Sequence, residues 1–283
     1  MNKVAASGFL KEPARESSPM TELPDRQLIA PVPQGMVARL RTALALDLRQ
    51  SAGGDAIGFG IRSLDAALGG GLVLGALHEV AAVREAEIPA ASGFALILAA
   101  RSQGPVVWIA EDMALAESGV PYGPGLEELG LAPERLIFVQ AAKSRDVLWA
   151  MEEAIRLSGH RTAGAVVGEI RGGIDPTATR RLSLAAGHSR TLALLLRSTP
   201  PNEPSAAVTR FLVGAVRSVP RGASAMAFGP GPPRFCVRVL RNRRGPLGTW
   251  MLEFDRVEQR FAPADREPVA QTALDRPRRA ASA

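Results

Sequence analysis

The lysines are the first residues to test for chemistry, because a P-loop needs one to bind the β- and γ-phosphates of a nucleotide. Its pattern, GxxxxGK[ST], also supplies backbone amides for the phosphates and a hydroxyl for Mg²⁺. The chain has only Lys3, Lys11 and Lys143, and none fits this pattern. Lys143 follows an apolar segment and precedes Ser144, but Ala141 and Ala142 stand where glycines are needed. We therefore interpret Lys143 as structural.

A better candidate for a phosphate loop lies in the segment AAVREAEIPAASGFALILAAR, which runs from an expected strand into an expected helix. Gly93 stands at the junction, but Phe94 and Ala95 follow it where Lys and Ser or Thr would bind phosphate and Mg²⁺. Glu85 and Glu87 add negative charge to the same loop. The segment therefore predicts no ordinary ATP site and no cofactor.

Other catalytic patterns are absent from the sequence. Its three histidines are far apart, and there is no HExxH, CxxC or GxSxG motif, which argues against a metal site or a serine nucleophile. The single cysteine, Cys236, excludes a disulfide framework and lies in an apolar strand pattern, so we expect it to be buried. Glu111 and Asp112 follow an apolar strand, where ligands of α/β sheets bind. A solvated loop is the alternative interpretation.

Charge is distributed unevenly along the chain. Residues 1–150 carry a net charge of −4 and residues 151–283 a net charge of +10. No acid occurs between Pro204 and Leu252, a stretch that contains eight arginines. A one-sided basic region is typical of polyanion binding. The alternative is a compositional bias of the genome, because arginine is abundant and lysine rare. The candidate contacts to nucleic acid or a partner are Arg197, Arg234, Arg238, Arg241, Arg243 and Arg244.

These residues need elements to position them, and the hydrophobic pattern supplies an alternation of strands and helices. Strands are expected at 77–81, 106–110, 136–140, 164–170 and 191–196, with helices at 93–101, 146–158 and from Asp175-Pro176 to Gly187. Apolar strands that alternate with helices indicate a mostly parallel sheet covered on both faces. Strands at 211–216, 235–240 and 249–254 follow without helices, and a short polar link joins the last two in an antiparallel hairpin.

The two ends of the chain have a different composition. Residues 1–54 are predicted to be a flexible arm with a helix at about 35–50, and residues 263–283 a disordered tail. The domain between them spans 55–262. Because no apolar run reaches the ~18 residues of a membrane span and no secretory signal is evident, we expect a soluble, cytoplasmic protein that does not bind membranes.

The serial order of several segments resembles the RecA recombinase core. IGFGIRSLDAALGGGLVLGALHEV resembles the entry to the strand before the P-loop, and WIAED, which contains Glu111, resembles the strand that ends in the catalytic glutamate. AGAVVGEI resembles the Walker B strand, and TLALLLRS the strand beside the DNA-binding loop. The final apolar segments resemble its antiparallel strands. The resemblance runs from about Ile57 to Phe261 and implies a RecA-like fold.

Departures from the RecA pattern imply a degenerate P-loop and a degenerate nucleotide site. Phe94 replaces the lysine and Ala95 the hydroxyl residue after Gly93. Gly168 stands at the Walker B aspartate, and Glu169 comes one residue late, so its side chain should face the opposite side of the sheet. Arg241 and Arg243 keep a basic pair where RecA has basic residues that reach a neighbouring subunit's nucleotide, so subunit stacking or DNA contact stays open.

A RecA-like core of this kind, with flexible ends and many arginines, is similar to the ImuA family, also described as SulA-like. The resemblance implies a non-catalytic accessory protein in DNA-damage-induced SOS mutagenesis and translesion synthesis. Its implied partners are an ImuB-like inactive relative of Y-family polymerases and an error-prone C-family polymerase, with RecA and DNA as further candidates. Two alternatives remain open: a divergent DNA-dependent ATPase that uses Glu111, Glu169 and arginines, and a SulA-like inhibitor of cell division.

Overall fold

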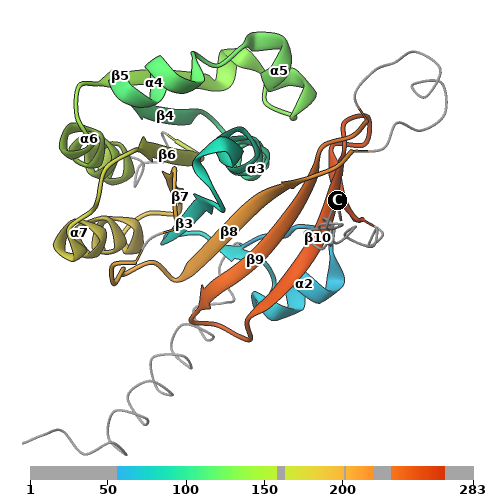
Figure 1. Ribbon diagram of the computed structural model, residues 1–283. Coiled ribbons are helices and arrows are strands. Elements are labelled where there is room, and N and C mark those ends of the chain that lie inside the picture. The colour runs from blue at the N-terminus through green and yellow to red at the C-terminus, as the bar shows by residue number, and fades with distance from the viewer. Residues whose placement is uncertain (1–55, 158–162, 201, 219–230, 265–283) are drawn as a thin grey trace, which may run out of the picture. The chain divides into compact units, whose positions relative to one another are not determined.

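The described residues form an α/β domain around one large sheet. The computed structural model describes residues 56–157, 163–200, 202–218 and 231–264. The predicted arm, with its helix at 35–50, and nearly all of the predicted tail lie outside these residues. Within them, nine strands form a sheet in the order β11-β10-β9-β8-β3-β7-β6-β4-β5 (Figure 1). Their bounds are β3 Ala76–Ala82, β4 Val106–Glu111, β5 Leu136–Ala141, β6 Ala165–Ile170, β7 Leu192–Arg197, β8 Thr209–Val216, β9 Arg234–Asn242, β10 Gly248–Asp255 and β11 Arg260–Pro263.

The sheet changes from parallel to antiparallel at β8. Strands β5, β4, β6, β7, β3 and β8 are parallel to one another, whereas β8–β9, β9–β10 and β10–β11 are antiparallel pairs. The predicted mostly parallel sheet with antiparallel final strands is therefore confirmed, as is the hairpin of β9 and β10. Two short strands, β1 Ala56–Ile57 and β2 Leu72–Val73, form a separate antiparallel pair.

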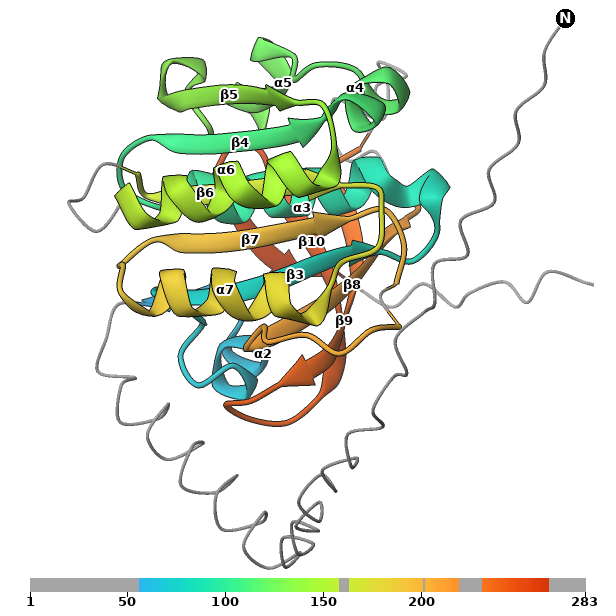
Figure 2. The same ribbon diagram turned by 90° about the vertical axis from the view of Figure 1, so that its left-hand side faces the viewer.

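Helices cover both faces of the parallel strands. Helices α6 (Ser144–Leu157) and α7 (Pro176–Gly187) pack on one face, in front of β6, β7 and β3 in Figure 2. Helix α3 (Ile88–Ala100) packs on the other face, and the antiparallel strands curve toward it in Figure 1. Shorter helices are α2 Arg62–Ala67, α4 Asp112–Ser118 and α5 Gly123–Glu128, with 3₁₀ turns η2 Glu85–Glu87 and η3 Pro133–Arg135.

The sequence explains the ends and faces of these helices. Asp175 caps α7, since its carboxylate accepts a hydrogen bond of 2.9 Å from the Thr177 backbone amide, and Pro176 occupies the first turn. Helix α6 buries Val147, Met151 and Ile155, which recur every four residues on one face. Helix α3 is apolar all round because the sheet covers one side and β9–β11 contribute apolar residues to the same core. None of the described helices is both long and apolar enough to cross a bilayer.

Helix α3 begins earlier than the sequence predicted. Its first residue is Ile88, five residues before the predicted start at Gly93, and Pro89 lies in its first turn. Proline is favoured there because backbone amides of the first turn have no acceptor within the helix, so the amide hydrogen that proline lacks is not needed. The shift matters for the site, because it places Gly93 within the helix and leaves only Val83–Glu87 to connect β3 to α3.

Candidate functional site

The connection between β3 and α3 is where the sheet topology would place a phosphate loop. It runs from Val83 to Glu87 and contains no glycine. None of these described residues has a positive φ, so the backbone does not form the concave nest of amides that holds a phosphate. Arg84 is bound to Glu87 at 2.6 Å, and Glu85 is exposed beside them. The loop therefore presents carboxylates where a nucleotide would bring its own negative charge.

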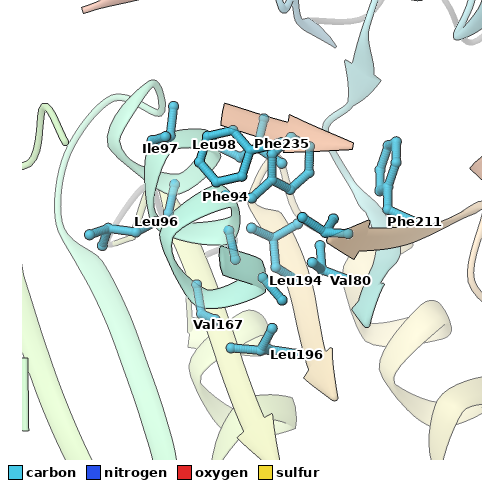
Figure 3. Packing of buried hydrophobic residues seen from close by; sticks show 14 of the residues in the cluster. Val80, Phe94, Leu96, Ile97, Leu98, Val167, Leu194, Leu196, Phe211 and Phe235 are labelled. Carbon is cyan, nitrogen blue, oxygen red and sulfur yellow. The ribbon is translucent and has the colours of Figure 1, made fainter. Parts of the chain in front are cut away.

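Phe94 lies in the second turn of α3 and points into the core. Its side chain is fully buried, near Phe235 and Phe211 (Figure 3). Its ring centroid lies 6.0 Å from that of Phe59 and 5.8 Å from those of Phe211, Phe235 and Phe261. Aromatic pairs at this separation add stability beyond the area they bury. The position that the sequence analysis aligned with a phosphate-binding lysine is thus an anchor of the hydrophobic core.

The neighbours of Phe94 also lie within α3, but they differ in exposure. Ala95 is fully buried, whereas Gly93 is partly exposed, and a Cβ added to it would lie 3.8 Å from Leu129 Cδ1, an ordinary packing distance. Gly93, Phe94 and Ala95 therefore do not form a loop around a ligand. They form part of the contact between α3, the sheet and the segment after α5.

Glu111 ends β4, and its carboxylate holds two neighbouring segments together. Its Oε2 atom accepts hydrogen bonds from Ser144 Oγ at 2.7 Å and from the Arg171 backbone amide at 3.0 Å. Ser144 opens α6 and Arg171 follows β6. At this edge of the sheet Glu111 positions the start of α6 against the end of β6, a structural task that occupies one of its oxygens.

Gly168 and Glu169 face opposite sides of β6, as their alternation predicts. A Cβ at Gly168 would lie only 2.7 Å from Met151 Sδ, so α6 leaves no space for a carboxylate there. Glu169 faces the α3 side, where its carboxylate accepts 3.1 Å bonds from Trp108 Nε1 and Arg171 Nη1. The two residues therefore do not converge on one site.

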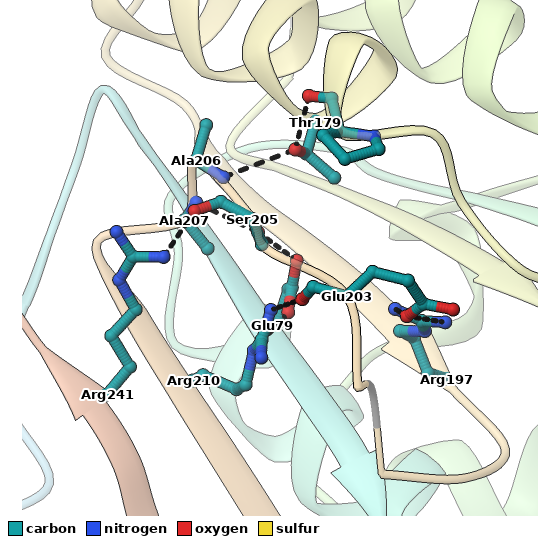
Figure 4. A network of polar contacts seen from close by, with 10 residues as sticks. Glu79, Thr179, Arg197, Glu203, Ser205, Ala206, Ala207, Arg210 and Arg241 are labelled. Atoms are coloured by element: carbon teal, nitrogen blue, oxygen red, sulfur yellow. Dashed lines mark hydrogen bonds and ion pairs between the residues drawn. The ribbon is translucent and has the colours of Figure 1, made fainter.

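A second polar cluster lies on the other face of β3, and its centre is Glu79. This fully buried carboxylate accepts hydrogen bonds from Ser205 Oγ and, at 2.7 Å, from Arg210 Nε (Figure 4). Arg241 Nη1 donates to the Ser205 carbonyl, and Arg197 pairs with Glu203 at 3.3 Å. Together these bonds fix the connection between β7 and β8.

Comparison with known proteins decides the family. No family model matches the chain. It is 33% identical over 211 residues to Protein ImuA of Caulobacter vibrioides strain NA1000 / CB15N, and the match covers 70% of this chain and 82% of that protein. Protein ImuA of Caulobacter vibrioides strain ATCC 19089 / CIP 103742 / CB 15 matches to the same extent. The chain belongs to the ImuA family.

The six arginines proposed as contacts have different surroundings in this ImuA-family chain. Arg234 is buried and bound to Glu253 at 2.6 Å, and Arg244 is buried with a 2.9 Å bond to the Gly69 carbonyl. Arg197 is buried beside Glu203, and Arg241 is partly buried against Ser205. Burial lowers the pKa of Arg241, and the nearby Arg243 and Arg210 lower it further. Only Arg238 and Arg243 are exposed.

Sequence reasoning missed the Glu79 cluster of this ImuA-family chain. A signal was present, because Glu79 interrupts an apolar strand and a buried carboxylate needs a partner. Its partner, Arg210, lies 131 residues away, and periodicity does not pair such distant positions. Within the described residues no group of three or more His, Cys, Asp or Glu side chains is arranged to hold a metal ion.

Proposed function

We propose that this chain is an accessory protein in DNA-damage-induced mutagenesis and that it supports an error-prone translesion polymerase assembly. Its membership of the ImuA family is the observation that carries the proposal. An ImuB-like polymerase relative and a C-family polymerase are the proposed partners, with RecA and DNA as additional ones, and the proposed compartment is the cytoplasm. The chain contributes contacts to this assembly rather than a reaction.

The core is proposed to be RecA-like. The segments that resemble the recombinase strands, β3, β4, β6 and β7, are parallel neighbours in one sheet, and β8–β10 follow at the edge where the resemblance has its antiparallel strands. This agreement between the order along the chain and the order in space supports the assignment.

A non-catalytic role is supported by the residues at the expected nucleotide site. The β3–α3 connection carries Glu85 and Glu87, Phe94 is enclosed by other phenylalanines, and Met151 fills the space next to Gly168. A nucleoside triphosphate at this connection would find no amide nest, and the cation of the connection, Arg84, is already bound to Glu87.

DNA contact is proposed for Arg238 and Arg243. Both are exposed, on β9 and in the turn that follows it, whereas the other four candidate arginines have internal partners or are buried. Two exposed guanidinium groups without acids between them along the chain can bind phosphate oxygens.

The proposal is tested by deleting the gene from its host and measuring the frequency of mutations induced by ultraviolet light. Deletion should lower this frequency toward the spontaneous level, and a plasmid copy of the wild-type chain should restore it. The R238A/R243A double variant should restore it only in part, and R180A, at an exposed arginine on α7, serves as its control. An unchanged frequency after deletion would refute the accessory role. Filamentation on overexpression, without a change in mutation frequency, would favour the division inhibitor instead.

A further inference from the structure

A groove that the proposed function does not use lies above β4 and β5, between α3, α4 and α5. Its volume is about 270 Å³. Trp108 and Phe138 contribute to it from the sheet, and Leu96, Leu115 and Leu129 contribute from the surrounding segments. Most of this lining is apolar. We call it the α4–α5 groove.

Large apolar side chains stand exposed at the mouth of the α4–α5 groove. Val120 is 71% exposed and Tyr122 is 74% exposed, and both belong to the short link between α4 and α5 that lines the groove. An apolar hollow continued by exposed apolar side chains is typical of a surface that binds another protein.

The chain around the α4–α5 groove is acidic. Residues 102–134 contain no Lys, Arg or His, but they contain Glu111, Asp112, Glu117, Glu127, Glu128 and Glu134. All but Glu111 are exposed. Glu117 adjoins the lining residue Ser118, and Glu127 and Glu128 lie between the lining residues Leu126 and Leu129. Arg171 pairs with Glu117 at 2.8 Å and Arg256 pairs with Glu128 at 3.3 Å, so these two acids are partly neutralised. With Glu127 on α5 and Asp112 at the start of α4, the acids around the groove still outnumber these two arginines.

The carboxylate inside the groove is already neutralised. Glu169 lines it, but its two oxygens accept bonds from Arg171 and from the Trp108 indole. A free cation would therefore find no unpaired carboxylate at the base. The volume also falls just below the range of about 300–1,000 Å³ that is typical of small-molecule pockets, and it suits one or two large side chains.

We infer that the α4–α5 groove is a docking site for a basic segment of a partner protein, which inserts one or two large apolar side chains between flanking Lys or Arg residues. The buried apolar side chains supply most of the affinity. The exposed acids on α4 and α5 raise the association rate and select a basic over an acidic partner. This surface lies apart from the arginines invoked above, so the inference goes beyond the proposed function and does not depend on it.

The test selects short random peptides from a displayed library against the full-length chain. The V120K variant places a positively charged ammonium group at the mouth of the groove. V257K is its control, because Val257 is 91% exposed and does not line the groove. Enriched peptides should combine Lys or Arg with Leu, Phe or Trp. As synthetic peptides they should bind V120K about tenfold or more weakly than the wild type, a loss typical of an interface anchor, and bind V257K unchanged.

Further measurements separate the contributions of apolar contact and charge. Tyr122→Ala should weaken binding with little effect of salt, and Leu247→Ala, at another exposed position, should not. Glu127→Lys should weaken it most at low salt, where surface charges are least screened. Enrichment of acidic peptides, no enrichment, or equal binding to V120K and wild type would overturn the inference. Leu40, Leu44 and Leu48 belong to the helix expected at about 35–50. Peptides that bind only after these leucines are changed to Ala would also overturn the inference, because residues 35–50 of the same chain would then be the occupant of the groove.

These outcomes are independent of the mutagenesis test. A chain that restores induced mutation in the V120K form while losing peptide binding would support the groove without touching the proposed function. If instead V120K binds the peptides as tightly as the wild type, the groove is not the docking site, and the accessory role is unaffected by that result.

Discussion

The two faces of β3 show how differently one strand can be stabilised. On the α3 side Val80 and Ala82 belong to a hydrophobic cluster that includes Phe94 and Phe211. On the α7 side Glu79 is buried among the polar partners Ser205 and Arg210. The apolar side chains of β3 pack with Phe94 of α3, and the carboxylate of Glu79 fixes the β7–β8 connection through Ser205. On β3, then, the buried charge lies on the α7 side and holds a loop, whereas Val80 and Ala82 on the α3 side pack in the hydrophobic core.

A charge placed on the apolar α3 side of β3 is expected to have the largest effect on stability. Phe94→Lys should destabilise the domain by about 5 kcal/mol or more, because it removes a large buried ring and buries an ammonium group among phenylalanines. That loss approaches the whole stability of an ordinary domain. Urea unfolding followed by circular dichroism measures it, with Phe94→Leu as the milder control. A stable Phe94→Lys protein that binds ATP would show that residue 94 faces a nucleotide after all.

On the polar face the expected loss is smaller. Glu79→Ala should cost about 3–4 kcal/mol in unfolding free energy, because it leaves the largely buried Arg210 guanidinium without its carboxylate. Glu79→Gln keeps an acceptor for Ser205 and should recover part of the loss. Proteolysis at the β7–β8 connection provides a second measurement, since loss of these bonds should make residues 198–208 easier to cleave. Unchanged stability in Glu79→Ala would mean that the cluster does not fix the loop.

A buried histidine of β3, His78, should make the free energy of unfolding depend on pH. Burial lowers the pKa of His78 to about 4, from an ordinary value of 6.5. Because the unfolded chain binds the proton more readily, stability is retained above pH 6.5 and falls as the pH drops toward 4. The contribution of His78 should amount to about 2 kcal/mol between pH 7 and pH 5. His78→Gln should show a shallower dependence of the unfolding free energy on pH over this window. An equal slope in both proteins would contradict a buried neutral imidazole.

The smallest effect on stability is expected at the exposed arginines. Arg243→Ala should change the unfolding free energy by less than about 0.5 kcal/mol, as surface substitutions usually do. If Arg243 binds a DNA phosphate, the slope of log affinity against log salt concentration should decrease by about 1. Fluorescence anisotropy with single-stranded DNA measures this slope, and Arg180→Ala is the matched control. An unchanged slope would remove Arg243 from the proposed DNA surface.

Much of the fold was predictable because its strands are short apolar runs separated by helices with clear caps. Asp175-Pro176 marked the start of α7 correctly, and the strands at 106–110 and 136–140 were predicted within one residue. Helices α2, α4 and α5 were not predicted, since six or seven residues give too little periodicity to recognise. The start of α3 was wrong because Ser92-Gly93 resembles a helix boundary, whereas Pro89 gave the true signal.

The candidate site was less predictable than the fold. The resemblance to RecA implied that Phe94 stands at the position of a P-loop lysine, but the sequence did not indicate that Phe94 lies among four other phenylalanines from distant segments. The number of arginines in the sequence also did not reveal which of them have internal partners. Arg234 and Arg244 looked like surface charge, yet Glu253 and the Gly69 carbonyl hold them in the interior. Such pairs depend on tertiary contacts, which composition does not record.

The proposal of a non-catalytic, RecA-like core predicts above all that the chain does not turn over ATP. Titration of the full-length chain with ATP and Mg²⁺ in a calorimeter, followed by an assay of phosphate release with single-stranded DNA present, tests it. We expect no micromolar binding and no release above the buffer control. Micromolar binding with turnover that is lost in the Arg241/Arg243 double alanine variant would contradict the account and identify the chain as a divergent DNA-dependent ATPase.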